Sequence, residues 1–470
     1  MPQEEPGVQH AEHVQQVRAR MEPCAERAPA HGIVPPMRFL GRVRGRLRQR
    51  LSASPVAGNV LRLLAGNAFA QVLTLAAYPI LTRIYAPAQI GLLSTLMAAV
   101  TILAPASALR LEMALPLART NREAGSMLAA SAGALMLTSL AITCVLLLMP
   151  AAWPADMAVA YQYRWALPVA LLAFGGYVIM VGEATRQARF GDIARTRVAQ
   201  AFSGPVCQIG LGLGGLGTPG LIAGYVIGQS AGTFGLVRKL LRGPASPLRR
   251  ISRASVCAGI SRHRNFVLFS SWTGVVNAAA SYSMTVAFAF LYGPAISAYM
   301  FLGERILMRP LFLITSSILP VYTKEVVRTR QTDPARLSSL FQRVAGRQAL
   351  LSVAWIGPIV VAAPYLIPAV FGAQWGESAK YVQILAIGYF PTSVLHPVMH
   401  TLQMLKEQRL SAALDVGRGL AVFASIAAVA AMRLPPLTAA IACSVVQALA
   451  MVAIFLLTWR RVRQVSRDGG

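Results

Sequence analysis

The sequence of 470 residues has few charged side chains and very few acidic ones. Asp, Glu, Lys and Arg together make up 13% of it, about half the share found in an ordinary soluble domain. Only 17 residues are acidic and 44 are basic, so the formal net charge is +27 at pH 7. This shortage of charge, with a hydrophobic content of 55% and a mean hydropathy of +0.54, excludes an ordinary soluble globular protein.

Cysteine is also scarce, and its five occurrences have no paired spacing. Three of them fall in apolar runs, where a small buried side chain is the simplest interpretation. The chain lacks a glycine-rich nucleotide-binding motif and any metal-ligand spacing, and the loops between apolar runs are too short for a catalytic domain. The sequence therefore predicts no enzyme activity, no metal and no cofactor.

What the sequence does contain is a series of apolar blocks of about 20 residues, the length of a helix that crosses a bilayer. We therefore predict an all-α polytopic membrane protein with twelve transmembrane helices. The expected spans are 60–82, 88–109, 125–148, 165–185, 194–216, 219–237, 265–291, 295–321, 342–363, 381–404, 411–431 and 437–459.

The placement of the basic residues tests this count. With a cytoplasmic start, the segments placed inside carry 33 Lys and Arg, and those placed outside carry only Arg83, Arg164, Lys380 and Arg433. A missed span would invert every later loop and destroy this asymmetry. The pattern predicts cytoplasmic N- and C-termini, and it explains the net charge by membrane topology rather than by nucleic-acid binding.

The longest basic connection follows the sixth span and divides the chain into two halves. We predict a disordered and then basic cytoplasmic arm (1–58), a first six-helix bundle (59–240), a basic cytoplasmic linker (241–264), a second six-helix bundle (265–459) and a basic tail (460–470). Halves of this kind commonly pack around a central site near the membrane midplane.

The first span of each half carries polar side chains on one face. Spaced three or four residues apart, they are Asn67, Gln71, Thr74 and Tyr78 in the first span and Ser270, Thr273, Asn277, Ser281 and Thr285 in the seventh. Lipid offers no hydrogen-bond partners, so such a stripe must face protein or water. We therefore expect Asn67, Gln71, Asn277 and Ser281 to line a polar cavity and to contact a substrate.

Two arginines of the eighth span are the strongest candidates for binding a charged substrate. Arg305 and Arg309 share one helix face, and with Glu304 as the only neighbouring carboxylate they leave positive charge in excess. Arginine binds phosphate bidentately and keeps its charge at any physiological pH. The two arginines would therefore suit an anionic, phosphate-bearing substrate in a central cavity, or they could serve only as partners of Glu304 within the bundle.

Other charges near the spans have two interpretations. Arg83 and Arg418 are further substrate candidates, but Arg83 could snorkel to the interface and Arg418 could pair with Asp415. Coupling to H⁺ or Na⁺ would need an ionisable group at membrane depth. The candidates for it are Asp415, Glu304, His396 and His400. The two histidines could instead be hydrogen-bonded within the bundle.

The stretch from Leu81 to Ala118 (LTRIYAPAQIGLLSTLMAAVTILAPASALRLEMALPLA) resembles the amino-terminal region of Wzx-type oligosaccharide flippases. These belong to the multidrug/oligosaccharidyl-lipid/polysaccharide exporter superfamily. The family's turn between the first two helices is matched by Leu81, Arg83, Ile84, Tyr85, Pro87 and Gly91, and its Arg-x-Glu-x-Ala-x-Pro exit by Arg110, Glu112, Ala114 and Pro116. With twelve spans in two halves, the resemblance covers about residues 60 to 460.

The resemblance implies two six-helix bundles in a V shape that work by alternating access in the bacterial inner membrane. The implied substrate is an undecaprenyl-diphosphate-linked oligosaccharide for exopolysaccharide, capsule or O-antigen of lipopolysaccharide, flipped to the periplasmic leaflet through a cationic cavity. Implied partners are this lipid-linked oligosaccharide, membrane lipids, and the polysaccharide polymerase and export machinery, without nucleic acid.

Two other functions remain open. A cation-coupled multidrug-extrusion antiporter of the same superfamily would need an acidic ion site in the first or seventh span, where the sequence has none. A membrane polysaccharide polymerase or ligase would normally have a large external loop, and the longest one here has about 16 residues. We therefore expect a flippase.

Overall fold

The computed structural model describes residues 55–148, 161–242, 253–262, 267 and 270–468, and this part of the chain is all-helical. The first half contains α3 (Pro55–Ile84), α4 (Pro87–Ser107), α5 (Leu111–Ala114), α6 (Asn121–Leu148), α8 (Ala166–Arg186), α9 (Phe190–Leu213), α10 (Gly217–Ser230), α11 (Thr233–Arg242) and α12 (Arg253–Arg262). The second half contains α13 (Ser271–Tyr292), α14 (Pro294–Thr332), α15 (Leu337–Phe371), α16 (Ser378–Leu395), α17 (Thr401–Met404), α18 (Gln408–Ala431) and α19 (Pro436–Asp468).

The helices pack into one unit that runs from Asn59 to Gly470, separate from the unit Met1–Gly58. Of the predicted arm 1–58, residues 1–54 lie outside the described residues, and residues 55–58 form the start of α3. Half of the predicted linker, 243–252 and 263–264, also lies outside them. The domain boundaries therefore stay predictions.

Eight helices of the described chain are long and apolar enough to cross a membrane. A ninth counts if the bent pair Pro294–Thr315 and Ile318–Thr332 forms a single span. A helix occupies each of the twelve ranges expected from the sequence, and the three outside this count are α3, α9 and α16. The structure thus shows an all-helical, multi-pass membrane protein.

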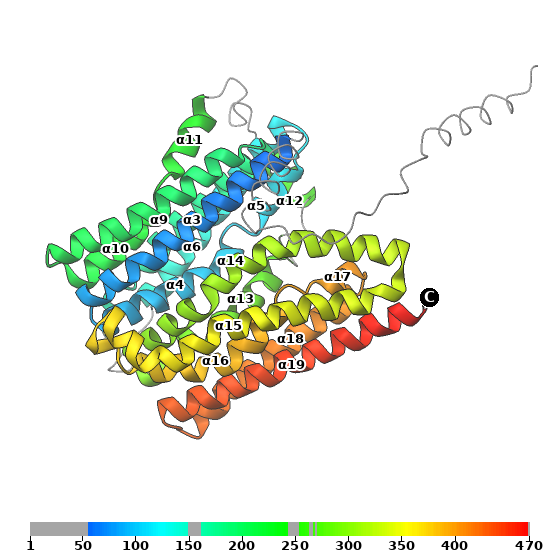
Figure 1. Cartoon of the computed structure of the whole chain (residues 1–470). Coiled ribbons are helices and arrows are strands. Elements are labelled where there is room, and N and C mark those ends of the chain that lie inside the picture. The colour runs from blue at the N-terminus through cyan, green and yellow to red at the C-terminus, as the bar shows by residue number, and fades with distance from the viewer. Residues whose placement is uncertain (1–54, 149–160, 243–252, 263–266, 268–269, 469–470) are drawn as a thin grey trace, which may run out of the picture. The chain divides into compact units, whose positions relative to one another are not determined.

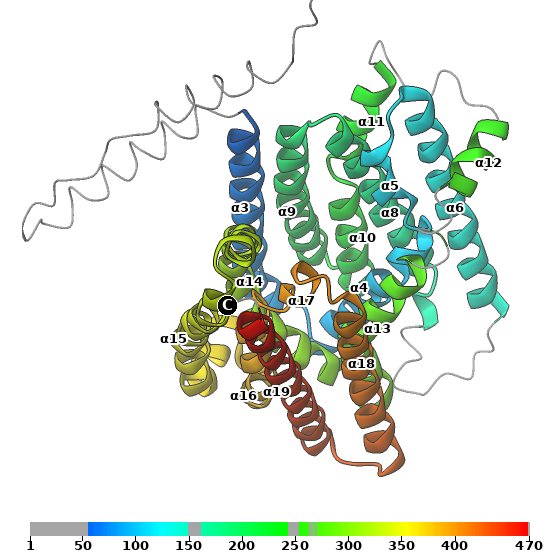
Figure 2. The ribbon, with the colours of Figure 1, turned by 90° about the vertical axis from the view of Figure 1, so that its right-hand side faces the viewer.

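The two halves meet mainly through α4, which packs against both α13 and α14 (Figures 1 and 2). The closest approach is at Gly91, where an added Cβ would lie 1.7 Å from the carbonyl oxygen of Pro294. Ser94 and Ser297 share a buried hydrogen bond of 3.1 Å one turn further along these helices. No side chain larger than hydrogen fits at position 91, which explains the glycine that opens α4.

The turn between α3 and α4 is held by the second half. The indole Nε1 of Trp375 and the amide of Gln374 both donate hydrogen bonds to the carbonyl oxygen of Thr82, at 2.8 and 2.6 Å. Arg83 donates in turn to the carbonyl oxygen of Ala369 at 3.0 Å. We call these contacts the turn clasp. They join residues that are almost 300 positions apart in the sequence.

Within the first half, α9 and α10 approach each other through glycines. A Cβ on Gly228 would lie 2.7 Å from the Cα of Gly204, and one on Gly224 would lie 2.5 Å from the Cγ of Gln208. Small residues let membrane helices come close enough for extensive van der Waals contact. The α9–α10 pair thereby forms a compact wall.

We expect Gly228→Ala to destabilise the protein by about 1–3 kcal/mol, because the methyl group collides with backbone that must shift. The measurement is the melting temperature of the purified protein in detergent. Gly133→Ala in α6 is the control, since its Cβ meets nothing within 4 Å and alanine favours the helix. Equal melting temperatures for the two variants would contradict the close packing.

Candidate substrate site

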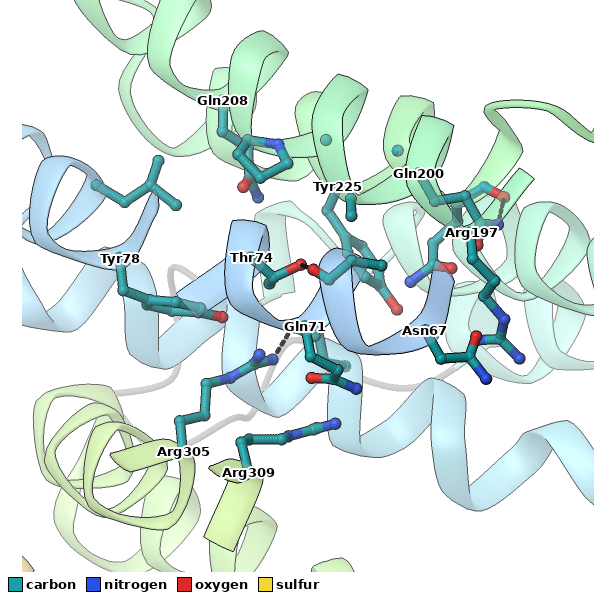
Figure 3. Close-up of a pocket in the computed structure, with 18 of the residues that line it drawn as sticks. Asn67, Gln71, Thr74, Tyr78, Arg197, Gln200, Gln208, Tyr225, Arg305 and Arg309 are labelled. Carbon is teal, nitrogen blue, oxygen red and sulfur yellow. Dashed lines mark hydrogen bonds between the residues drawn. The ribbon is translucent and has the colours of Figure 1, made fainter. Parts of the chain in front are cut away.

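A cavity of about 510 Å³ lies between α3, α4, α8, α9 and α10 of the first half and α14 of the second. Figure 3 shows Arg305 and Arg309 reaching into it from α14, with the polar stripe of α3 between them and α9. Its polar lining residues are Asn67, Gln71, Thr74, Tyr78, Arg197, Gln200, Gln208, Tyr225, Gln229, Arg305 and Arg309. The structure therefore brings together Asn67, Gln71 and both predicted arginines.

Arg305 lies in an aromatic environment without a counter-ion. Its side chain is only 7% exposed, and its Cζ lies 4.7 Å from the ring centre of Tyr78 and 4.3 Å from that of Phe301. The Nη2 donates a weak hydrogen bond to the sulfur of Met97 at 3.8 Å, and the Nε has no partner. Among the described residues, Arg305 forms no ion pair. The ring faces stabilise the cation partly but do not neutralise it.

Among the described residues, the lining of this cavity carries three arginines, Arg197, Arg305 and Arg309, and no carboxylate. A buried charge without a partner is strongly unfavourable, and an ion of opposite sign relieves that cost. Guanidinium groups match phosphate oxygens bidentately. The chemistry of this lining therefore suits an anion with several oxygens.

The wall opposite α14 was missed by the sequence interpretation. It consists of Arg197, Gln200 and Gln208 of α9 with Tyr225 and Gln229 of α10. Gln200 donates to the carbonyl oxygen of Gln229 at 2.8 Å, which ties the two helices together. A signal was present: the cavity-lining positions 197, 200, 204 and 208 follow the same three- or four-residue spacing as the stripe of α3.

A second cavity, of about 490 Å³, lies within the second half between α13, α14, α16, α18 and α19. The predicted residues that line it are Ser281, Glu304, Arg309, His396 and Arg418. Arg309 and Phe312 of α14 border both cavities, so this helix forms the partition between them.

Contacts in the second cavity are sparse. The ring of His396 meets Phe312 edge-on, with centroids 5.4 Å apart, and its buried Nδ1 has no partner. Arg418 lies 3.5 Å from the amide oxygen of Asn277 and forms no ion pair with Asp415 in the described chain. Glu304 and His396 thus face a space where a small cation or a proton could be held.

Four predicted site residues lie outside the linings of both cavities: Arg83, Asn277, His400 and Asp415. Arg83 belongs to the turn clasp, where it contacts backbone of the second half. Asn277 is adjacent to the second cavity through Arg418. Roles in binding or coupling stay predictions for all four.

The sequence matches a family model described as "Polysaccharide biosynthesis protein" over residues 80–380, more than half of the chain. The chain belongs to the polysaccharide biosynthesis protein family. This confirms the resemblance drawn from Leu81 to Ala118. Comparison with curated protein sequences gives no match.

Solved structures of similar fold agree with this family. An inward-facing multidrug resistance MATE family transporter of the MOP superfamily has a TM-score of 0.66 at 16% identity, over 84% of this chain and 96% of that one. The lipid II flippase MurJ in an inward closed conformation has a TM-score of 0.66 at 11% identity, over 86% of this chain and 90% of that one. An outward-facing MATE family transporter has a TM-score of 0.57 at 15% identity, over 88% of this chain and 97% of that one. At these identities the likeness shows the fold, which is that of MOP superfamily transporters.

In this member of the polysaccharide biosynthesis family, an ionic network fixes the start of α9, the helix that carries Arg197, Gln200 and Gln208. Asp192 accepts hydrogen bonds from Arg189 and from Lys239 of α11. Partial burial opposes ionisation of Asp192, but the hydrogen bonds from Lys239 and Arg189 outweigh it, so the pKa of Asp192 is lowered. The charged form therefore stabilises the folded protein.

We expect Asp192→Asn to lower the melting temperature at pH 7 by on the order of 1–2 °C. Because the pKa of Asp192 is lowered on folding, this stabilisation is complete above the pKa of the unfolded state, about 3.9. It is lost as the pH falls through the lower pKa of the folded state. Melting curves of wild type and variant should therefore converge below about pH 4. Asp333→Asn, which removes an exposed pair with Arg336, is the control with the smaller expected effect. A difference that grows in acid would contradict this assignment.

Proposed function

We propose that the protein is a flippase that moves an undecaprenyl-diphosphate-linked oligosaccharide from the cytoplasmic to the outer leaflet of the bacterial inner membrane. One observation carries the proposal: Arg305 is buried and Arg309 is half-buried in a cavity whose lining, among the described residues, has no carboxylate. A diphosphate supplies the missing negative charge. The amides of Asn67, Gln71 and Gln200 suit the hydroxyl groups of a sugar, because they both donate and accept hydrogen bonds.

The second candidate, a cation-coupled drug antiporter, is suggested by the similarity to MATE family folds. A cationic drug would require carboxylates or an open aromatic cage in the larger cavity. The aromatic rings of Tyr78 and Phe301 are already occupied by Arg305. The lining chemistry therefore favours the flippase.

We further propose that all twelve helices cross the membrane as two six-helix bundles with cytoplasmic termini, and that the protein works by alternating access. In this topology the turn clasp and the Gly91 contact lie on the outer side. They would close that side while the cavity opens to the cytoplasm. The higher TM-score against the inward-facing MATE structure than against the outward-facing one supports this conformation.

Energy coupling would belong to the second cavity. Glu304 and His396 line it, and neither forms an ion pair within the described chain. Either could bind H⁺, and Glu304 could also bind Na⁺. Arg309 would transmit the change to the substrate cavity, since it borders both. The polysaccharide polymerase and export machinery would receive the flipped substrate.

Flipping of a labelled undecaprenyl-diphosphate oligosaccharide in proteoliposomes tests the substrate site. We expect Arg305→Gln and Arg309→Gln each to slow flipping about tenfold or more, because a charged hydrogen bond to the diphosphate is lost. Arg195→Gln on α9 is the matched control, since this exposed arginine lies outside both cavities and should leave the rate unchanged.

The outcomes separate the parts of the proposal. Equal rates in all variants would remove diphosphate binding from α14 but keep the flippase. A wild-type protein that moves no lipid-linked glycan, and instead exports a drug against a cation gradient, would overturn the function itself.

The turn clasp gives a test of alternating access. We expect Gln374→Ala with Trp375→Phe to weaken outer closure, because two hydrogen bonds to the carbonyl oxygen of Thr82 are lost. A cysteine placed at Leu93, in a background without native cysteines, should then react about fivefold faster or more with an impermeant maleimide added outside.

Gln383→Ala is the control for this experiment, because it removes a hydrogen bond to Val360 that lies within the second half alone. Labelling at position 93 that is unchanged in the clasp variant, or equally faster in the control, would count against outer closure by these contacts.

A further inference from the structure

Helix α11 carries a stripe of apolar and basic side chains that no other described element covers. Its members, at spacings of three, one, three and one, are Phe234, Val237, Arg238, Leu241 and Arg242, and they border one surface hollow. Phe234 is 77% exposed and Leu241 is 55% exposed. Such a face requires an environment that accepts both hydrocarbon and positive charge.

The opposite face of α11 is fixed to the helix bundle. Leu236 and Leu240 are buried, and Leu236 packs with Ala184 and Ile193. Lys239 is held by Asp192 at the start of α9. Because α11 is anchored on this side, its exposed stripe has a defined direction, away from α8 and α9.

The position of α11 along the chain puts this stripe at the membrane surface. Helix α10 ends at Ser230 and α11 begins at Thr233, after a break at Gly232 with a φ of +79°. The 14 residues of α10 rise about 21 Å, which is less than the roughly 30 Å of hydrocarbon in a bilayer. Helix α11 therefore completes the crossing and leaves the bilayer at headgroup depth. Figures 1 and 2 place it at the same end of the helices as α5 and α12.

The charges of the stripe select the kind of lipid. Within the described chain, neither Arg238 nor Arg242 is paired with a carboxylate. Arginines one helical turn apart beside apolar side chains suit phosphate groups above acyl chains. We propose that this stripe is a binding surface for anionic phospholipid headgroups, with Phe234, Val237 and Leu241 inserted among the acyl chains.

Lipid bound to this surface would stabilise the wall of the substrate cavity. Lys239 and Leu236 connect α11 to α9, and α9 supplies Arg197, Gln200 and Gln208 to the cavity wall. The binding surface itself does not depend on which substrate the cavity takes. Failure of the flippase assignment would therefore leave it standing.

Hydrogen–deuterium exchange of the α11 backbone, in the full-length protein, tests the surface directly. The protein is placed in nanodiscs of phosphatidylcholine, with or without phosphatidylglycerol. We expect exchange in the peptide Thr233–Arg242 to be on the order of tenfold slower with the anionic lipid. High salt should reduce this difference. Inorganic phosphate added to phosphatidylcholine nanodiscs should not reproduce it.

Two matched variants separate charge from folding. Arg238→Gln with Arg242→Gln should lose the dependence on phosphatidylglycerol, and Arg238→Lys with Arg242→Lys should keep most of it. The proposal is overturned if wild-type exchange is the same in both lipids, if the glutamine variant keeps the dependence, or if free phosphate protects α11 equally well. Equal protection by free phosphate would indicate a site for a soluble anion. Equal wild-type exchange in both lipids would be the result for a surface that binds an acidic protein instead.

Discussion

The arrangement of this protein depends on one buried positive charge. Arg305 lies between the rings of Tyr78 and Phe301, at 7% exposure, and forms no ion pair in the part of the chain that the structure describes. A membrane protein could neutralise such a group with one acidic residue, and Glu304 is its neighbour in sequence, yet Glu304 lines the other cavity. The helical rotation of 100° per residue separates the two charges. It leaves the larger cavity cationic and the smaller one with charges of both signs.

Close contact between backbones holds these cavities in place. Glycines at positions 91 and 228 let helices approach to distances that no side chain would permit. The contact at Gly91 joins the two halves, and the contact at Gly228 builds the wall behind the larger cavity. The turn clasp adds hydrogen bonds from Gln374 and Trp375 to a carbonyl oxygen at the end of α3. All of these contacts use backbone atoms.

Much of this could be predicted from the sequence. The lengths of the apolar blocks predicted twelve helices, and the structure has a helix in each of these ranges. The polar stripe of the first span predicted that Asn67 and Gln71 line a cavity, as they do. The spacing of Arg305 and Arg309 predicted a shared helix face, and this face borders the larger cavity. These features are local, because the periodicity of one helix determines which of its residues point the same way.

The remainder depends on how distant helices pack, which no local pattern contains. Arg197 lies within the expected span 194–216 but was not a site candidate, and only the packing of α9 brings it to the cavity. Arg83 was a substrate candidate, and the structure places its guanidinium on the carbonyl oxygen of Ala369, 286 residues away. The partition of the charged residues into two cavities likewise requires the orientation of α14 between the halves.

The partition has a thermodynamic consequence. Arg309 borders both cavities, and one guanidinium can neutralise an anion fully on only one side at a time. A proton or a cation on Glu304 would remove the negative charge that attracts Arg309 toward the second cavity, and it would therefore strengthen the hold of Arg309 on an anion in the first. By reciprocity of linkage, each occupant would change the affinity for the other by the same factor. A single side chain would thus be enough to couple the two binding equilibria, without any movement of the helices.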